Sequence, residues 1–157
     1  MIIITHPRRR NRLATLINSP GGISVGIALA QARDNIEAMR GQAMTVIDAG
    51  ISALEAVPAP ATREEAPASL DHAYRAATSV IDAAGPFELF DLCRAAAGLC
   101  DLIGAIDPEQ PFDWRIVTVH ARSLRLLQTL PLEAARERAH ILESLSEVIQ
   151  RKLAQPG

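Results

Sequence analysis

Histidine is the side chain through which this sequence could most readily do chemistry, and the neighbours of His72 favour it most. His72 stands off the apolar positions of its segment, with the cation Arg75 one helical turn further along. An exposed imidazole is a nucleophile, and a cation three residues away would steady a transferred anionic group. The spacing around His120 predicts a packed or interface histidine, whereas the polar surroundings of His140 predict a surface position. His6 belongs to the N-terminal segment.

The sequence carries no other catalytic signature. It lacks the glycine-rich phosphate loop, the dinucleotide-binding glycine pattern and the nucleophilic serine elbow of hydrolases. Its only lysine is Lys152, and its carboxylates are spread along polar faces beside arginines. We therefore expect no cofactor and no enzymatic activity, with a phosphohistidine carrier as the most that the residues allow.

The two cysteines predict neither a metal site nor a disulfide. Cys93 and Cys100 are seven residues apart, which is about 10.5 Å along a helix and too far for a disulfide within it. They are expected to be reduced thiols that pack as small apolar residues. A net charge of −2 gives no attraction to nucleic acid or to an anionic membrane. No stretch suits a secretory signal or a membrane span, so a cytoplasmic location is expected.

Helices are the elements that must position these side chains. Hydrophobic residues make up 48% of the chain, and they recur at helical rather than alternating spacing. The pattern predicts an all-α, up-down helical bundle as a single domain over 23–157, after a flexible basic arm over 1–22 that contains Arg8 and Arg12. The expected helices are 23–57, 67–84, 86–105, 113–130 and 131–153, with a proline-rich linker over 58–66 between the first two.

The helix over 86–105 is expected to be central, because it is apolar around most of its circumference. Its most buried residues are predicted to be Phe90, Cys93, Ala97 and Cys100. The stripe predicted to be buried in the helix over 67–84 is Leu70, Ala73, Tyr74, Ala77, Val80, Ile81 and Ala84. In the last helix, it is Leu132, Ala135, Ala139, Leu142, Leu145, Ile149 and Leu153.

The first helix carries a heptad seam, in which apolar residues alternate steps of four and three. Its members are Val25, Leu29, Ala32, Ile36, Met39, Ala43 and Val46. A helix over 23–57 would be about 50 Å long at 1.5 Å per residue. Either part of it projects, or it breaks near Gly41 or Gly50. Uncovered apolar residues favour a partner, so the seam predicts a homodimer through Val25, Leu29, Ala32, Ile36, Met39 and Ala43.

The segment from His72 to Ala77, which reads His-Ala-Tyr-Arg-Ala-Ala, resembles the H-x-x-[KR]-G-[SA] motif of histidine-containing phosphotransfer (HPt) domains. Val80 to Cys93 also resembles the helix, glycine-containing turn and next helix of that family. The resemblance implies an HPt-like four-helix core that binds a response regulator or histidine kinase through His72, Arg75, Ala76, Ser79 and Asp82. Alignment on Gly85 places Arg75 where the family has its histidine, so we expect a degenerate HPt-like bundle.

The chain as a whole resembles the small alphaproteobacterial chemotaxis proteins called CheE. The matching pieces are Arg12-Leu13, Ser19 to Gly22, Asn35 to Glu37, Ala73 to Ile103 and Trp114 to Leu127. Together the two resemblances imply a non-enzymatic adaptor in chemotaxis or two-component signalling, which docks a response regulator or histidine kinase. Two alternatives remain open: a phosphorelay protein that carries phosphate on His72, and a purely structural homodimeric helical protein.

Overall fold

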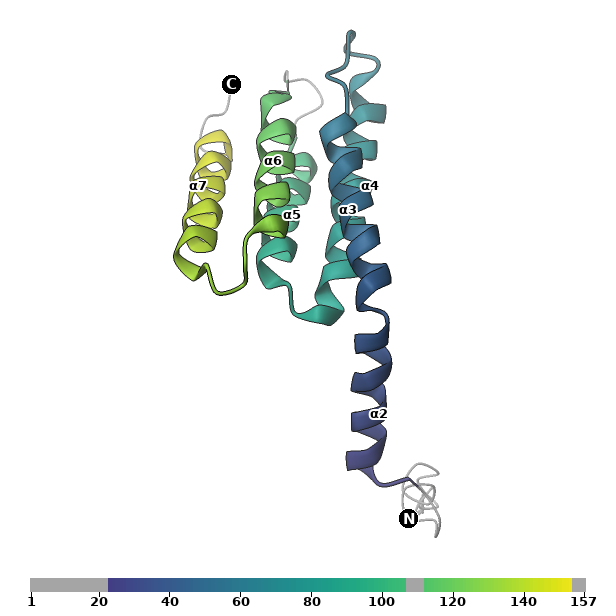
Figure 1. Ribbon diagram of the computed structural model, residues 1–157. Coiled ribbons are helices and arrows are strands. Elements are labelled where there is room, and N and C mark those ends of the chain that lie inside the picture. Colours follow the sequence, from purple (N-terminus) through teal and green to yellow (C-terminus); the bar gives the residue numbers. More distant parts are fainter. Residues whose placement is uncertain (1–22, 107–111, 154–157) are drawn as a thin grey trace, which may run out of the picture. The chain divides into compact units, whose positions relative to one another are not determined.

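The computed structural model describes residues 23–106 and 112–153, which fold into helices (Figure 1). The α-helices are α2 (Val25–Ala38), α3 (Arg40–Ala56), α4 (Ala66–Ala84), α5 (Phe90–Gly104), α6 (Arg115–Thr129) and α7 (Ala135–Leu153), and a short 3₁₀ helix, η1 (Gly85–Phe87), precedes α5. Within those two ranges no strand is present, so the predicted all-α class is confirmed. The predicted basic arm over 1–22 lies outside the described residues.

The chain divides into two compact units, with the boundary between Glu37 and Ala38. All of α2 except Ala38 belongs to the first unit, and none of the side chains of α2 is buried. The helix expected over 23–57 is interrupted at Met39, where φ is −89° and ψ is −5°. The interruption is two residues before Gly41, in agreement with the predicted alternative of a break there, because glycine lowers helix propensity.

In the second unit, α3, α4, α5 and α6 form a four-helix bundle with up-down topology (Figure 1). Each helix packs against the next one in the chain, and α3 also packs against α6, which closes the ring. The last helix, α7, packs against α5 and α6 from outside this ring. Because α5 contacts α4, α6 and α7, its predicted central position is confirmed.

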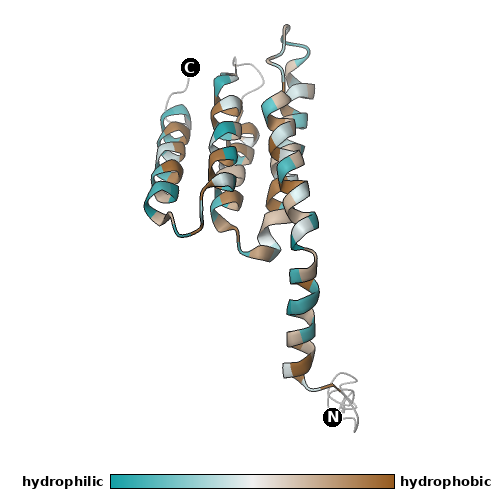
Figure 2. Cartoon of the chain, in the orientation of Figure 1, coloured by the Kyte–Doolittle hydropathy of each residue, from teal (hydrophilic) through white to brown (hydrophobic). Residues whose placement is uncertain are grey.

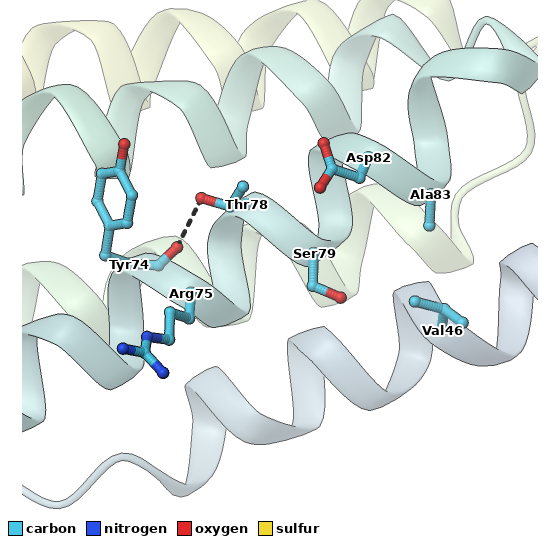
Figure 3. Close-up of a pocket in the computed structure, with 7 residues that line it drawn as sticks. All are labelled: Val46, Tyr74, Arg75, Thr78, Ser79, Asp82 and Ala83. Atoms are coloured by element: carbon cyan, nitrogen blue, oxygen red, sulfur yellow. Dashed lines mark hydrogen bonds between the residues drawn. The ribbon is translucent and has the colours of Figure 1, made fainter.

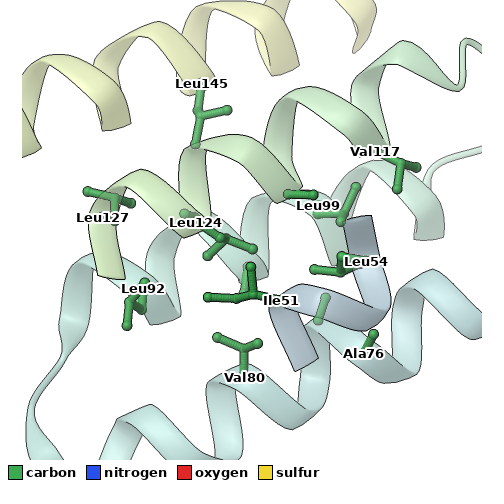
Figure 4. Packing of buried hydrophobic residues seen from close by; sticks show 14 of the residues in the cluster. Ile51, Leu54, Ala76, Val80, Leu92, Leu99, Val117, Leu124, Leu127 and Leu145 are labelled. Atoms are coloured by element: carbon green, nitrogen blue, oxygen red, sulfur yellow. The ribbon is translucent and has the colours of Figure 1, made fainter. Parts of the chain in front are cut away.

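The core of this unit lies between the helices, where buried hydrophobic side chains pack against one another (Figure 4). Hydrophobic and hydrophilic residues alternate along each helix of the bundle (Figure 2). Its largest fully buried apolar side chains are Ile47, Ile51, Leu54, Val80, Leu92, Leu99, Leu124 and Leu127. Alanines complete it at the helix contacts, among them Ala73, Ala77, Ala84, Ala96 and Ala121, all 0% exposed. Small residues at these contacts let the neighbouring backbones approach closely.

The buried face of α5 is rotated from the predicted one. Its buried residues are Leu92, Ala95, Ala96, Leu99 and Leu102. The predicted residues Cys93, Ala97 and Cys100 are only half-buried, and Phe90 is 66% exposed. That prediction was wrong because a helix that is apolar nearly all round has no periodicity to show which side faces the core. On α4, Tyr74 was likewise assigned to the buried stripe and is 45% exposed.

Pro86 and Pro131 are the first residues of the helices expected over 86–105 and 131–153, but neither begins an α-helix. Pro67 does lie in the first turn of α4, as predicted. Pro86 instead lies in η1, and Glu88 takes a left-handed conformation with φ of 58° before α5 begins at Phe90. Residues 131–134 form a turn before α7. Both prolines lie close behind a preceding helix, and reversing the chain between antiparallel helices needs residues outside helical geometry there.

The first turns of α7 also present a different face from the predicted stripe. Leu132 is 64% exposed, Ala135 and Ala139 are exposed, and the side chain that is buried there is Arg138, at 3% exposed. Further along, the predicted burial of Leu142 and Leu145 is confirmed. The side chain of Leu153 lies outside the described residues.

Candidate functional site

α4 carries the residues predicted to bind a partner, and it has one buried and one open face. The buried face consists of Ala73, Ala76, Ala77, Val80 and Ala84, and α4 packs against α3 and α5. The approach to α3 is tight at Gly50, where an added Cβ would lie 2.8 Å from Val80 Cγ2 and 3.2 Å from the carbonyl oxygen of Ala76. The inner face of α4 is thus held tightly by the bundle.

The predicted partner-binding residues lie on both faces of α4. His72, Arg75 and Asp82 are exposed, and Ser79 is half-buried. Ala76 is only 8% exposed and belongs to the buried face. Its small side chain serves the packing against α3 and does not stand beside His72 and Arg75 on the outer surface.

The cation of the HPt-like motif is paired with a neighbouring carboxylate. Arg75 Nε lies 3.0 Å from Asp71 Oδ2, one turn earlier on α4, and the two side chains are 78% and 57% exposed. An exposed pair of this kind contributes only about 0.3–0.5 kcal/mol, so Arg75 can readily exchange Asp71 for another acidic group. The imidazole of His72 has no hydrogen bond or ion pair with any residue that the structure describes.

A shallow groove of about 510 Å³ lies over the open face of α4 and one residue of α3 (Figure 3). Its lining residues are Val46, Tyr74, Arg75, Thr78, Ser79, Asp82 and Ala83. Val46 and Tyr74 provide exposed apolar surface, and Thr78 Oγ1 donates a hydrogen bond to the carbonyl of Tyr74 at 3.0 Å. Within the described part of the chain, the carboxylate of Asp82 has no partner. Arg75, Ser79 and Asp82 therefore line one groove, whereas His72 and Ala76 do not.

The cysteines pack at the contact between α4 and α5. Cys93 Sγ lies 3.8 Å from the carbonyl oxygen of Ile81, and Cys100 Sγ lies 3.9 Å from Thr78 Oγ1. Burial raises the pKa of both thiols, which keeps them protonated and weakly nucleophilic. In residues 23–106 and 112–153, no group of histidine, cysteine or acidic side chains is arranged to hold a metal ion.

His120 of α6 is a packed core histidine, which confirms the prediction. It is 0% exposed, and its Nδ1 lies 2.9 Å from the carbonyl oxygen of Ile116. A carbonyl only accepts, so Nδ1 carries the proton and Nε2 is left with an unshared electron pair. Nε2 has no hydrogen-bond partner in the described structure, and it faces Gly98 of α5. Burial lowers the pKa of His120, while the Ile116 carbonyl raises it by a smaller amount.

Arg138 is a buried charge that was not predicted from the sequence. Its Nε donates to Asp91 Oδ2 at 2.6 Å, at the start of α5. Its Nη1 donates to the carbonyls of Leu127 at 2.7 Å and Leu130 at 3.0 Å, at the end of α6. Arg138 therefore satisfies carbonyls that lack a partner within their own helix. The available signal was its spacing, because it lies four residues before Leu142 on the apolar stripe of α7.

Comparison with known proteins leaves the family open. No protein-family model, no curated protein and no solved structure matches this chain. None of the described helices is both long enough and apolar enough to span a membrane.

Proposed function

We propose that this chain is a non-enzymatic adaptor that docks a protein partner through the open face of α4. The groove on that face is the observation that carries the proposal, because it gathers Arg75, Ser79 and Asp82 on one surface. Two of these side chains are exposed charges, and Tyr74 and Val46 add apolar surface beside them. A mixture of this kind, on a helix whose inner face is tightly packed, suits recognition of another protein.

The partner that we propose is a cytoplasmic response regulator or chemotaxis histidine kinase. This choice rests on the resemblance of the segment from His72 to Ala77 to the HPt motif and of the whole chain to CheE. The four-helix ring of α3 to α6 is compatible with it. The partner class is therefore an inference from the sequence, supported by where α4 places its charged residues.

Phosphotransfer through His72 is the second candidate, because the imidazole is exposed on the same helix as the groove. Two observations favour docking without phosphate. Arg75 is paired with Asp71, and that carboxylate directly precedes His72, where it would repel a phosphoryl group. Ala76, the small residue of the motif, faces α3.

Self-association through the heptad seam is a further part of the proposal. The seam residues Val25, Leu29, Ile36 and Met39 are 70%, 56%, 43% and 58% exposed. An isolated helix of fewer than about 12–15 residues is marginally stable in water, and α2 has 14 residues. A second copy that covers this seam would stabilise α2 and bury its apolar side chains.

The docking proposal is tested by binding of the full chain to purified response regulators and chemotaxis kinases from the source organism. Arg75→Glu should weaken binding by about tenfold, equivalent to about 1.4 kcal/mol. The matched control is Arg122→Glu, which reverses an exposed arginine on α6 and should change the dissociation constant less than about twofold. Equal binding by the wild type and Arg75→Glu would place the interface elsewhere.

The same response regulators and kinases also distinguish docking from phosphotransfer. Incubation with a phosphorylated regulator or an autophosphorylated kinase should leave no acid-labile label on this chain, and His72→Gln should bind as the wild type does. Label that is present on the wild type and lost in His72→Gln would replace the adaptor with a phosphorelay protein. A chain that dimerises but binds none of these partners would be a structural homodimer.

A further inference from the structure

We propose that the open face of α4 pairs with the same face of a second copy of this chain, antiparallel, about a two-fold axis that passes between Thr78 and Ser79. Arg75 and Asp82 lie at equal distances on either side of that point. They are seven residues apart, or about 10.5 Å along the helix at 1.5 Å per residue. An antiparallel copy therefore brings Arg75 of each chain opposite Asp82 of the other.

A two-fold interface uses one surface twice, so that surface must be complementary to itself. The charges on this face meet the requirement, since they have opposite signs and symmetric positions. Residues at the centre, Thr78 and Ser79, are small and carry hydroxyl groups, so they permit close approach of the two helices. Two arginine–aspartate pairs would form per dimer, one on each side of the axis.

The shape of the groove agrees with the position in which Arg75 of the second copy would lie. In Figure 3, Arg75 projects from one end of the groove on the side of α3, and Val46 lies beyond the axis on that side. A half-turn about the axis carries Arg75 of the copy to the Val46 end of the groove, which Asp82 also lines. Its aliphatic stem would cover Val46, which is 39% exposed, while the guanidinium reaches the carboxylate.

Both charges are available for this exchange. Asp82 has no ion pair or hydrogen bond within the described part of the chain. Arg75 is paired only with Asp71, and both of those side chains are mostly exposed. Replacing that intrahelical pair by one between chains loses little, because the groups are already largely hydrated on the surface.

Self-pairing would cover the groove and so limit access of another protein to it. This regulatory consequence rests on the proposed docking function, whereas the pairing itself does not. A chain that pairs through α4 would release Arg75, Ser79 and Asp82 only on dissociation, so partner binding would weaken as the concentration of the chain rises.

The test is a charge swap read by sedimentation equilibrium at low ionic strength, over a wide range of concentration. All variants carry Ile36→Glu, which removes the contribution of the seam on α2. Arg75→Asp alone and Asp82→Arg alone should each abolish dimers, because each places like charges opposite one another. The double variant should dimerise again, and so should an equimolar mixture of the two single variants. Glu147→Arg, a charge reversal on α7, is the control and should dimerise like its parent.

Three outcomes would overturn the proposal. The first is that the parent, which carries Ile36→Glu alone, stays monomeric at every concentration. The others are single variants that dimerise as this parent does, and a mixture of the two single variants that stays monomeric. Circular dichroism of each variant shows whether the helices are intact. Since no partner protein is present in this experiment, its failure leaves the docking proposal standing, and failure of the docking test leaves this one standing.

Discussion

Replacing Gly50 by alanine should destabilise the bundle, although alanine is the better helix former. Gly50 lies within α3 and is buried against α4. The new Cβ would lie 2.8 Å from Val80 Cγ2 and 3.2 Å from the carbonyl oxygen of Ala76. Val80 is 0% exposed and the Ala76 oxygen is backbone, so neither can move aside without shifting α4 against α3.

The change in the free energy of unfolding that Gly50→Ala causes is the sum of two opposing effects. Alanine in a helix interior is favoured over glycine by about 1 kcal/mol. Overpacking of a well-packed core costs about 1–3 kcal/mol, so Gly50→Ala should lower the free energy of unfolding by about 1 kcal/mol. At Gly41, also in α3, an added Cβ would meet nothing within 4 Å. Gly41→Ala should therefore raise the free energy of unfolding by up to about 1 kcal/mol.

Urea denaturation followed by circular dichroism measures both effects, provided that the slope of each transition is the same as in the wild type. The decisive quantity is the difference between the two variants, which is expected to be about 2 kcal/mol in favour of Gly41→Ala. Gly98→Ala provides an intermediate case, because its Cβ would meet only the flexible end of Ile149 closely, at 2.7 Å. If Gly50→Ala is as stable as Gly41→Ala, the close approach of α3 to α4 is not a packing constraint.

Three further predictions concern other parts of the chain. Arg138→Met should lower the free energy of unfolding by about 1–3 kcal/mol, because the buried carbonyl of Leu127 loses its donor, whereas the exposed control Arg136→Met should change it by less than about 0.5 kcal/mol in the same urea assay. The pKa of His120 is lower in the folded state, so the unfolded chain binds more protons and stability should fall as the pH drops from about 6.5 toward that lower value. His120→Leu should flatten this slope in urea titrations at a series of pH values. Ile36→Glu should abolish association through the seam and so lower the average mass in light scattering, and an unchanged mass would exclude that seam.

The fold class could be predicted from the sequence because helical periodicity is a local property. The buried residues of α6 include Val117, Ala121, Leu124 and Leu127, at the spacing seen in the sequence. The start of α4 could also be predicted, since Pro67 in the first turn removes an amide that needs no partner there. Pro86, after α4, and Pro131, after α6, wrongly predicted where the next helix begins. The turn that reverses the chain there is determined by how the two helices pack.

Which side of each helix is buried was harder to predict than where the helices lie in the sequence. On α5 apolar residues surround most of the helix, so the choice between Leu99 and Cys100 as the buried position depends on contacts with three other helices. For the same reason, the burial of the polar residue Arg138 could not be predicted from its own helix. Its burial depends on Asp91 and on carbonyls from α6, which come together only in the folded bundle.

For the candidate site, the sequence predicted which residues share the open face of α4, apart from Ala76. The polar side chains of Arg75, Ser79 and Asp82 are separated from the apolar stripe by helical spacing alone, so their common surface followed from the sequence. Ala76 did not, because alanine is compatible with either face, and its burial depends on how α4 packs against its neighbours in the folded bundle.

The separation of the two faces of α4 makes its surface chemistry testable without loss of the fold. Charge changes at Arg75 and Asp82 act on exposed side chains that lie outside the buried face of α4. They should therefore alter association while leaving the free energy of unfolding nearly unchanged, since surface substitutions usually stay within about 0.5 kcal/mol. Gly50→Ala acts in the opposite way, because it disturbs the packing beneath α4 and leaves the outer charges in place. If recognition depends on the outer face alone, the variants at Arg75 and Asp82 should change association but not the free energy of unfolding. Gly50→Ala should change the free energy of unfolding but not association.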